Sequence, residues 1–512
     1  MINKSNQVGL FSAICIGIGS IIGSGWLFAS YYAAKFAGPI AVASWIIGAI
    51  ISLVIALLLA EVATMFPENG LFSRLLTISH NRDIGFIIAI SNWLAIVMVI
   101  PSEAVATIQY LGNIFPNIAN KIFIDDGLTT LGSISAICIM LIYALLNYWG
   151  IRSLTKSNNI ITSIKIFIPI LTGLIIMKSA FHIDNFTSYK STIAPYGIDK
   201  AFSSIVTCGI FYAFCGFNMI TVFARELKNP QKNIPIALCS AIIICLIIYL
   251  LLQISFIGGV NPQSVAKGWN NLHFTSPFAE LSILLGINWL SIVLYADAAL
   301  SPSGTGIIYL GSGARMINAM AEDKQTFKWF APIHPHYNIS RASLLFTLFC
   351  CCIAVLFFAN WQKIIIVATV FRLISCIAVP VAFCKLRFTK SDYKREFILP
   401  AGEFFSMSCF ILLSYLFLNT STRAILFTIL VIISFFCIYC ITFYGLNLTK
   451  IFRAIKSSWT IFAYLMTILL LDYFKEHHLI TNSYLETLLF MSISLIYYQL
   501  FKHQKDYSNK HG

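Results

Sequence analysis

Gly17-Ile-Gly-Ser-Ile-Ile-Gly-Ser-Gly25 lies in the middle of an apolar run from about Val8 to Ala34. The run is long enough to cross a bilayer, because a spanning helix needs about 20 apolar residues. Its glycines oppose a continuous helix, since each costs roughly 1 kcal/mol relative to alanine. A break at membrane depth is tolerated where the freed backbone faces protein or a watery cavity. The stretch therefore predicts either a binding site for a small charged solute or close helix packing through small residues.

The composition of the chain is that of a polytopic membrane protein. Of its 512 residues, 58% are hydrophobic and 11% are charged, well outside the usual composition of soluble domains. The net charge of +14 falls in short loops between apolar runs, which excludes a basic nucleic-acid-binding patch and matches the positive cytoplasmic loops of membrane proteins. The 14 cysteines lie mostly inside apolar segments, so we expect small buried side chains rather than metal or redox sites.

Apolar runs predict an all-α protein with about fourteen membrane-spanning helices. Lys and Arg are concentrated in alternate loops, which predicts a multi-pass protein of the inner or plasma membrane with both termini, 1–7 and 502–512, in the cytoplasm. The segment 312–340 is expected to form short helix and turn. The predicted spans cover residues 8–34, 39–62, 84–110, 132–150, 158–178, 202–223, 236–259, 278–311, 341–359, 364–385, 403–419, 424–446, 458–474 and 484–501.

A second interrupted helix is predicted in the sixth span. The stretch Phe211-Tyr-Ala-Phe-Cys-Gly-Phe-Asn218 places Gly216 among aromatic residues near the middle of that span. It follows the first interruption by five spans, so it opens a second set of five. Breaks at matching places in two halves indicate a transporter with an inverted repeat and a site at the midplane.

Four stretches in the same order resemble motifs of a known family. They match its first-helix motif, its proline–glycine loop, its sixth helix with the following loop, and the segment after its eighth helix. On these stretches the chain resembles the amino acid permeases of the amino acid–polyamine–organocation superfamily over about residues 8–386. The Tyr-Ala-Asp-Ala-Ala-Leu-Ser-Pro-Ser-Gly-Thr-Gly stretch from Tyr295 is similar to aspartate–proton symporter-like members. The four stretches are Gly17–Gly25, Pro67–Gly70, Phe211–Pro235 with Glu226-Leu-Lys-Asn-Pro230, and Gly313–Asp323.

The resemblance implies a LeuT-like fold of two five-helix repeats, 8–178 and 202–386. Helices one and six would be discontinuous and would hold an amino acid between them. Helices 11 and 12, within 403–446, and helices 13 and 14, within 458–501, would be peripheral.

The predicted substrate site is formed by the two interrupted helices. A half-helix beginning near Ser24 would direct its N-terminal N–H groups at a carboxylate. Carbonyls near Gly17 to Gly19 and near Phe211 to Phe214 could accept from the ammonium group. The phenylalanines could close over the solute or pack in the core. The residues that the resemblance and the break positions place at the site are Ile18, Gly19, Ser20, Gly23, Ser24, Gly25, Phe211, Phe214, Cys215, Gly216 and Phe217.

Lys165 is the candidate for proton coupling. It lies in the fifth span, and ionisable groups inside spans are expensive and usually functional. Proton-coupled members of the resembled family carry an amine at the matching place. The alternative is a lysine that extends to the cytoplasmic face.

Three more ionisable residues lie inside predicted spans, namely Glu103, Asp297 and Arg372. Any of them could select a substrate side chain, shuttle protons or form an ion pair with another. Arg372 bears most on selectivity, because a fixed cation near the site would favour an acidic amino acid.

Charged residues at the cytoplasmic ends of two spans are candidates for gate salt bridges. Glu61 and Glu226 lie near Arg74 and Arg225 in the sequence. Solvated loop charges are the alternative interpretation.

The sequence as a whole predicts a secondary transporter with an amino acid, a proton and the lipid bilayer as its partners. Proton-driven uptake, with acidic amino acids such as aspartate or glutamate as candidates, stands beside exchange of an amino acid for an amine. A nutrient sensor built on a permease fold is disfavoured by the short tail after Phe501. We expect no enzyme activity, no cofactor and no metal, because neither a His/Asp/Cys cluster nor a G-x-x-x-x-G-K-[ST] loop is found.

Overall fold

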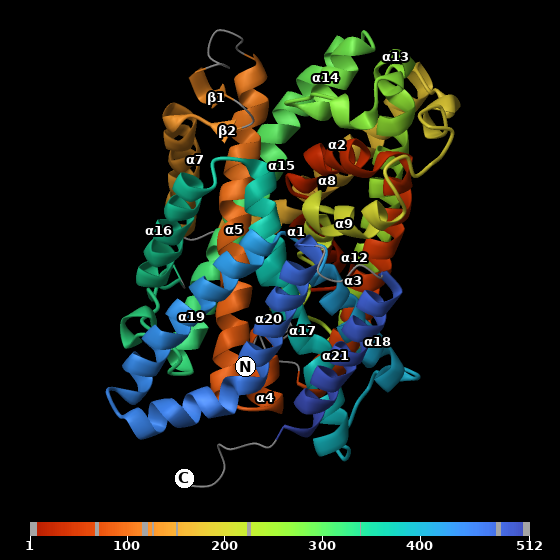
Figure 1. Ribbon diagram of the computed structural model, residues 1–512. Helices are drawn as coiled ribbons and strands as arrows, with labels where there is room; N and C mark the ends of the chain where they lie inside the picture. Colours follow the sequence, from red (N-terminus) through yellow and green to blue (C-terminus); the bar gives the residue numbers. More distant parts are fainter. Residues whose placement is uncertain are drawn as a thin grey trace.

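The helices of the molecule form a bundle around one long helix, α5 (Figure 1). The computed structural model describes residues 8–66, 71–114, 121–124, 127–149, 152–222, 227–337, 339–477 and 483–504, without the side chains of 152–161, 222 and 483–486. Three motif positions singled out in the sequence, Pro67–Gly70, Arg225 and Glu226, lie outside the described residues, as do the terminal segments 1–7 and 505–512.

The first half of the chain supplies α5 and the helices around it. A short antiparallel hairpin of β1 (Phe123–Ile124) and β2 (Gly127–Leu128) follows α5. The helices are α1 (Leu10–Ile21), α2 (Gly25–Ala37), α3 (Ala41–Met65), α4 (Leu71–Ser79), α5 (Arg82–Ile114), α7 (Thr130–Tyr148), α8 (Arg152–Ser179), α9 (Asp199–Thr207), α10 (Ile210–Phe214), α11 (Met219–Val222) and α12 (Pro230–Gly259).

The second half packs two long helices, α15 and α17, against α5. In Figure 1 the end of the bundle with α13, α14 and the hairpin is at the top, and α4 is at the bottom. We call these the upper and lower ends. The helices are α13 (Pro262–Ala266), α14 (Pro277–Leu284), α15 (Asn288–Glu322), α16 (Arg341–Phe357), α17 (Trp361–Thr389), α18 (Gly402–Phe417), α19 (Thr422–Tyr444), α20 (Leu448–Glu476) and α21 (Ser483–His503).

Length and composition make this a polytopic membrane protein. Eight of the described helices are long and apolar enough to cross a membrane, or nine if a bent pair is one span. The larger number expected from the sequence also counts shorter apolar helices such as α1, α16 and α18.

The first predicted interruption lies at Ile22–Ser24, between α1 and α2. The glycines of the motif have different surroundings. A methyl group added at Gly17, inside α1, would lie 2.8 Å from Ile220 Cδ1 and 2.9 Å from Ala241 Cβ. Gly17 therefore allows close helix packing, whereas Gly23 lies in the break itself. Close packing therefore describes Gly17, and a binding site at the break around Gly23 stays a prediction.

The sixth span has two interruptions where the sequence predicted one. Cys215–Asn218 separates α10 from α11, and Cys208–Gly209 separates α9 from α10, where the chain bends by 58°. Gly216 has φ +128°, and a methyl group there would collide with the carbonyl oxygen of Ser20. The two broken helices therefore meet backbone to backbone, and a side chain at Gly216 would separate them.

The region predicted as one span, 278–311, is built differently. α14 ends at Leu284 and α15 begins at Asn288, with Gly286 between them at φ +74°. α15 then continues to Glu322, through residues predicted to form short helix and turn. Its glycines do not end it, because Gly311 and Gly313 pack against Asn147 and Thr347 of neighbouring helices.

Candidate functional site

The C-terminal end of α1 is held by side chains from other helices. The last carbonyls of a helix have no partner within it. Lys165 Nζ donates to the carbonyl oxygens of Gly19, at 3.0 Å, and Ile22, at 2.9 Å, and to Thr305 Oγ1 at 2.7 Å. Tyr309 donates to the Ser20 carbonyl at 3.4 Å. Lys165 is 2% exposed, so it binds the break rather than extending to the surface.

The N-terminal end of α2 is held by a carboxylate. Glu103 Oε2 accepts the backbone N–H of Ser24 at 2.7 Å. Its Oε1 accepts the hydroxyl of Tyr212, on α10, at 2.9 Å. Gly23 makes this approach possible, since a methyl group there would lie 2.6 Å from Glu103 Oε1. Glu103 is 1% exposed.

These two contacts match the polarity of the helix ends. A helix carries partial positive charge at its N-terminus and partial negative charge at its C-terminus. Glu103 binds the N-terminus of α2, and Lys165 binds the C-terminus of α1. The break therefore presents separate places for an anion and a cation, which are the two charges of an amino acid.

A small cavity lies where the broken helices meet. Its volume is about 10 Å³, which is close to the space of one water molecule. An amino acid is much larger, so binding one requires these helices to move apart. The cavity is lined by Ser20, Ile21, Gly23, Val99, Glu103, Tyr212, Cys215, Thr305 and Tyr309.

Three stacked rings separate this cavity from the upper end of the bundle. Trp361 lies against Phe28 and Tyr32, with ring centroids 4.7 and 5.7 Å apart. Its Nε1 donates to Ser24 Oγ at 3.0 Å. The edge of Tyr212 meets the same indole at 6.2 Å. We call Phe28, Tyr32 and Trp361 the ring layer.

The remaining candidates of the broken helices surround the cavity at different depths. Cys215 lines it, and Gly25 packs closely against Ala213. Ile18 is buried, and its carbonyl accepts the N–H of Ile22 at 2.8 Å.

The phenylalanines of the sixth span lie in the core rather than at the cavity wall. Phe214 packs against Trp45 and Tyr249, with ring centroids 5.8 and 5.4 Å apart. Phe211 and Phe217 are buried and do not line the described cavity.

The other intramembrane charges do not form the ion pairs that were one alternative. Arg372 Nη1 donates to Asn92 Oδ1 at 2.7 Å. Its Nη2 is buried without a hydrogen-bond partner among the described residues. Arg372 lies beside Cys215 and Tyr309, two residues that line the cavity.

Asp297 begins a polar row along α15. Asp297, Ser301 and Thr305 are spaced by four residues, so they lie on one face of the helix. Both carboxyl oxygens of Asp297 and the hydroxyl of Ser301 are buried without hydrogen-bond partners within the described part of the chain. The row ends at Thr305, which accepts from Lys165.

Sequence reasoning missed several of the groups at the break. Tyr212, Thr305 and Tyr309 were not singled out, although each lines the cavity. Tyr212 was inside a quoted motif, and the helical period from Asp297 would have led to Thr305 and Tyr309.

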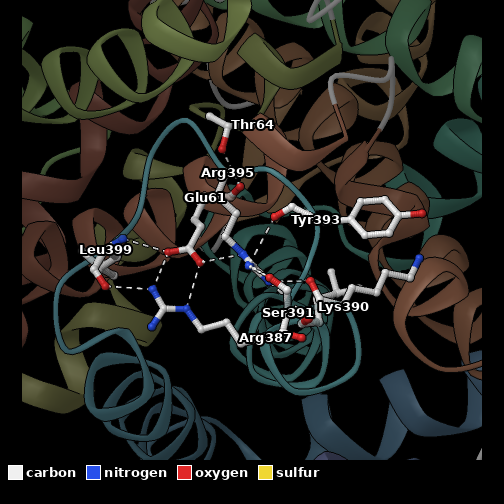
Figure 2. A network of polar contacts seen from close by, with 9 residues as sticks. Glu61, Thr64, Arg387, Lys390, Ser391, Tyr393, Arg395 and Leu399 are labelled. Carbon is white, nitrogen blue, oxygen red and sulfur yellow. Dashed lines mark hydrogen bonds and ion pairs between the residues drawn. The ribbon is translucent and has the colours of Figure 1, made fainter.

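The lower end holds another buried carboxylate, Glu61, near the end of α3 (Figure 2). Arg387 binds it through Nε at 2.8 Å and Nη2 at 2.6 Å. Arg395 Nε lies 3.5 Å from Oε1, and the Leu399 N–H donates to Oε2 at 2.8 Å. Arg74, which lies near Glu61 in the sequence, pairs instead with Asp323 at 2.6 Å.

Comparisons with known proteins identify the family and the fold of the chain. The family model described as "Amino acid permease" matches residues 8–470. The chain is 43% identical over 392 residues to the glutamate/serine transporter AimA of Bacillus subtilis (strain 168), covering 76% of this chain and 72% of that protein. It is 30% identical over 475 residues to an aspartate–proton symporter of the same organism, covering 92% and 90%. A crystal structure of the Eremococcus coleocola manganese transporter shares the fold, with a TM-score of 0.54, 13% identity and coverage of 96% and 95%.

Proposed function

The chain belongs to the amino acid permease family, and we propose that it takes up acidic amino acids together with protons by alternating access at the broken helices. The resemblance of the chain to permeases with a LeuT-like fold of two five-helix repeats supports this mechanism. The lower end, which carries Arg74, Arg387 and Arg395, would face the cytoplasm, in keeping with the positive-inside rule. The cell membrane is the proposed location.

The contact between Glu103 and the Ser24 N–H carries this proposal. Backbone N–H groups at a helix N-terminus are natural donors to carboxylates. In the structure Glu103 takes a position that a substrate carboxylate would need, at 2.7 Å from Ser24 N. The two carboxylates would then compete for the same donor.

A proton on Glu103 would resolve this competition. A neutral acid is a weaker acceptor than a carboxylate, because charge-assisted hydrogen bonds are about twice as strong as neutral ones. The proton would add to a carboxyl oxygen of Glu103 and loosen its bonds to Ser24 and Tyr212. The substrate carboxylate would then bind at Ser24, so that proton and substrate travel together.

Lys165 is the second group proposed to exchange a proton. Its ammonium holds the carbonyls of Gly19 and Ile22. Loss of a proton would weaken both bonds and release the end of α1. The row of Asp297, Ser301 and Thr305 supplies a polar route to Lys165 through otherwise apolar packing.

Selection of an acidic side chain is assigned to Arg372. Its Nη2 is buried without a hydrogen-bond partner in the described structure, and it lies beside Cys215, which lines the cavity. A guanidinium binds carboxylates well because its donors are planar and paired. The two similar transporters are named for glutamate with serine and for aspartate with protons, which supports the same substrate class.

The test is uptake of labelled amino acids into liposomes that contain the purified protein. We expect accumulation of aspartate or glutamate when the outside is acidic, and little accumulation without a pH gradient. Arg372→Lys should lower the preference for acidic over neutral amino acids. Uptake that needs amino acid or amine inside the liposomes and ignores the pH gradient would establish exchange and contradict the proposal.

A further inference from the structure

A second cavity lies above the ring layer, toward the upper end of the bundle. Its volume is about 360 Å³, within the roughly 300–1,000 Å³ that small-molecule sites occupy. We call it the vestibule. Its walls come from α2, α5, α9, β1, the start of α17, the segment before α9 and the segment after α13. The described residues that line it are Tyr31, Tyr32, Lys35, Phe36, Gln109, Phe123, Tyr196, Lys200, Asn270, Phe274, Asn360 and Gln362.

The charge of the vestibule is one-sided. Two lysines, Lys35 and Lys200, line it, and no carboxylate is found among the described lining residues. The described carboxylate near Lys200 is Asp199, whose Oδ2 lies 4.0 Å from the ammonium and whose side chain is 69% exposed. An exposed pair of this kind is weak. A cleft lined by one sign of charge concentrates ligands of the opposite sign.

Lys35 is positioned by a hydrogen bond that uses one of the three donors of its ammonium group. Its Nζ donates to the Tyr31 hydroxyl at 3.2 Å. Tyr31 is fixed in turn, because its hydroxyl donates to the Leu272 carbonyl and accepts from the Phe274 N–H. An ammonium has three donors, so a ligand carboxylate could take the others without moving the lysine.

The N-terminus of α17 adds partial positive charge to the same cavity. Asn360 and Gln362, which flank the first residue of this 29-residue helix, both line the vestibule. Gln362 is anchored by a bond from Nε2 to the Thr207 carbonyl at 3.2 Å. The Asn360 side chain accepts the Lys363 N–H at 3.1 Å, and the partial positive charge of the helix N-terminus favours an anion. The lysines and the helix end therefore give two independent reasons for anion binding.

The vestibule and the small cavity at the broken helices are connected through residues of the ring layer. Tyr32 lines the vestibule and stacks on Trp361 in the ring layer, and Trp361 bonds to Ser24 below. From this arrangement we propose that the vestibule is a first binding site for the anionic amino acid, where the lysines capture it before the ring layer opens. The proposal rests on the proposed function and identifies a part of the protein that selects acidic over neutral substrates.

The experiment compares glutamate with serine, the two amino acids in the name of the similar transporter. Uptake is measured in proteoliposomes for the wild type, for Lys35→Gln/Lys200→Gln, and for Lys35→Arg/Lys200→Arg, at low and high ionic strength. Lys267→Gln is the matched control, because Lys267 is exposed at the same end but does not line the vestibule.

We expect the double Gln variant to raise the KM for glutamate about ten-fold at low salt, since steering by a charged cleft has effects of this size or larger. The maximal rate should stay near that of the wild type. High salt should shrink the difference because it screens the lysines. The Arg variant should behave like the wild type, and serine uptake should not change.

Unchanged glutamate uptake in the double Gln variant would overturn the vestibule proposal, as would equal losses for glutamate and serine. Equal losses would indicate a structural role of the lysines. A wild type that transports neither amino acid would instead overturn the proposed function. The two failures are therefore distinguishable.

Discussion

Two glutamates of this transporter are equally buried but have different partners. Glu103, at the break between α1 and α2, and Glu61, at the lower end, are each 1% exposed. Glu61 is bound by the guanidinium groups of Arg387 and Arg395. Glu103 is bound by a backbone N–H and a tyrosine hydroxyl, which are neutral donors.

These partners determine which of the two carboxylates can take up and release a proton during transport. Loss of the charge of a carboxylate held by arginine would leave a guanidinium unpaired, which is costly in a buried site. A carboxylate held by neutral donors can accept a proton and leave them ready for another carboxylate. Under the proposed function, Glu61 would close the lower end and Glu103 would couple the proton to the substrate. Asp297 is a third buried carboxylate for this comparison, and it receives no hydrogen bond in the described structure.

The largest effect on stability is expected from Glu61→Gln, which leaves two arginines without their carboxylate. Breaking a buried pair costs roughly 3–5 kcal/mol, and we expect about 2–3 kcal/mol because the Arg387 side chain is 22% exposed. Thermal unfolding in detergent measures the loss. Asp323→Asn is the control, since its pair with Arg74 is about one-third exposed and should contribute less than about 1 kcal/mol. Equal shifts of the unfolding temperature for Glu61→Gln and Asp323→Asn would show that the buried Glu61 pairs stabilise the protein no more than an exposed pair does.

Glu103→Gln should change coupling more than stability. The amide keeps the shape of the side chain and can still accept the Ser24 N–H, but it cannot take up the transported proton. In the wild type, uptake should rise as the outside pH falls, because protonation of Glu103 frees Ser24. In the variant, we expect downhill transport to persist and accumulation driven by a pH gradient of one unit to fall about ten-fold, which is the largest ratio that such a gradient supports for one proton. Preserved accumulation would transfer the coupling role to Lys165.

Tyr212→Phe should also change proton coupling, but by less than Glu103→Gln. It removes one of the two donors to Glu103 and leaves the ring against Trp361. A hydrogen bond to a charged group contributes about 1.5–3 kcal/mol. Without the Tyr212 hydroxyl, the Glu103 carboxylate should therefore accept a proton more readily. The pH at which uptake is half-maximal should move upward. Tyr143→Phe is the control, because Tyr143 donates to Ser303 rather than to Glu103. A shift of the same size in both variants would argue against a specific contact.

The sequence predicts the position of the first break, because that feature depends on local chemistry. The glycines of the motif Gly17–Gly25 locate the first break, since their effect on helix stability is local. The partner of each charged residue depends on packing between distant segments, which composition does not encode. Glu61 is paired with Arg387, which lies 326 positions away, whereas its sequence neighbour Arg74 binds Asp323.

The same reasoning explains the position of Gly216 and the missed bend before it. The aromatic surroundings of Gly216 predict an interruption, but its contact with the Ser20 carbonyl follows from the meeting of the two broken helices. The bend at Cys208–Gly209 falls between helical segments without a proline or a cluster of glycines. Gly209 adopts a left-handed conformation there, with φ +83°, and it also lies against Trp361 and Ile365 of α17, so a single glycine and tertiary packing act together.

The smallest effect on stability is expected from Asp297→Asn. No hydrogen bond from a described residue is lost, because neither carboxyl oxygen has a partner, and an amide is less costly to bury than a carboxylate. Thermal unfolding should therefore be unchanged or shifted slightly upward. If the row from Asp297 through Ser301 to Lys165 carries the proton, the rate of pH-driven uptake should fall while downhill exchange of labelled substrate continues. A clear loss of stability would show that the carboxylate has a structural partner, and an unchanged pH-driven rate would exclude the row as the proton route. Glu61, Glu103 and Asp297 are the three buried carboxylates compared. Either result would leave Glu103, which is bound by neutral donors, as the one suited to coupling.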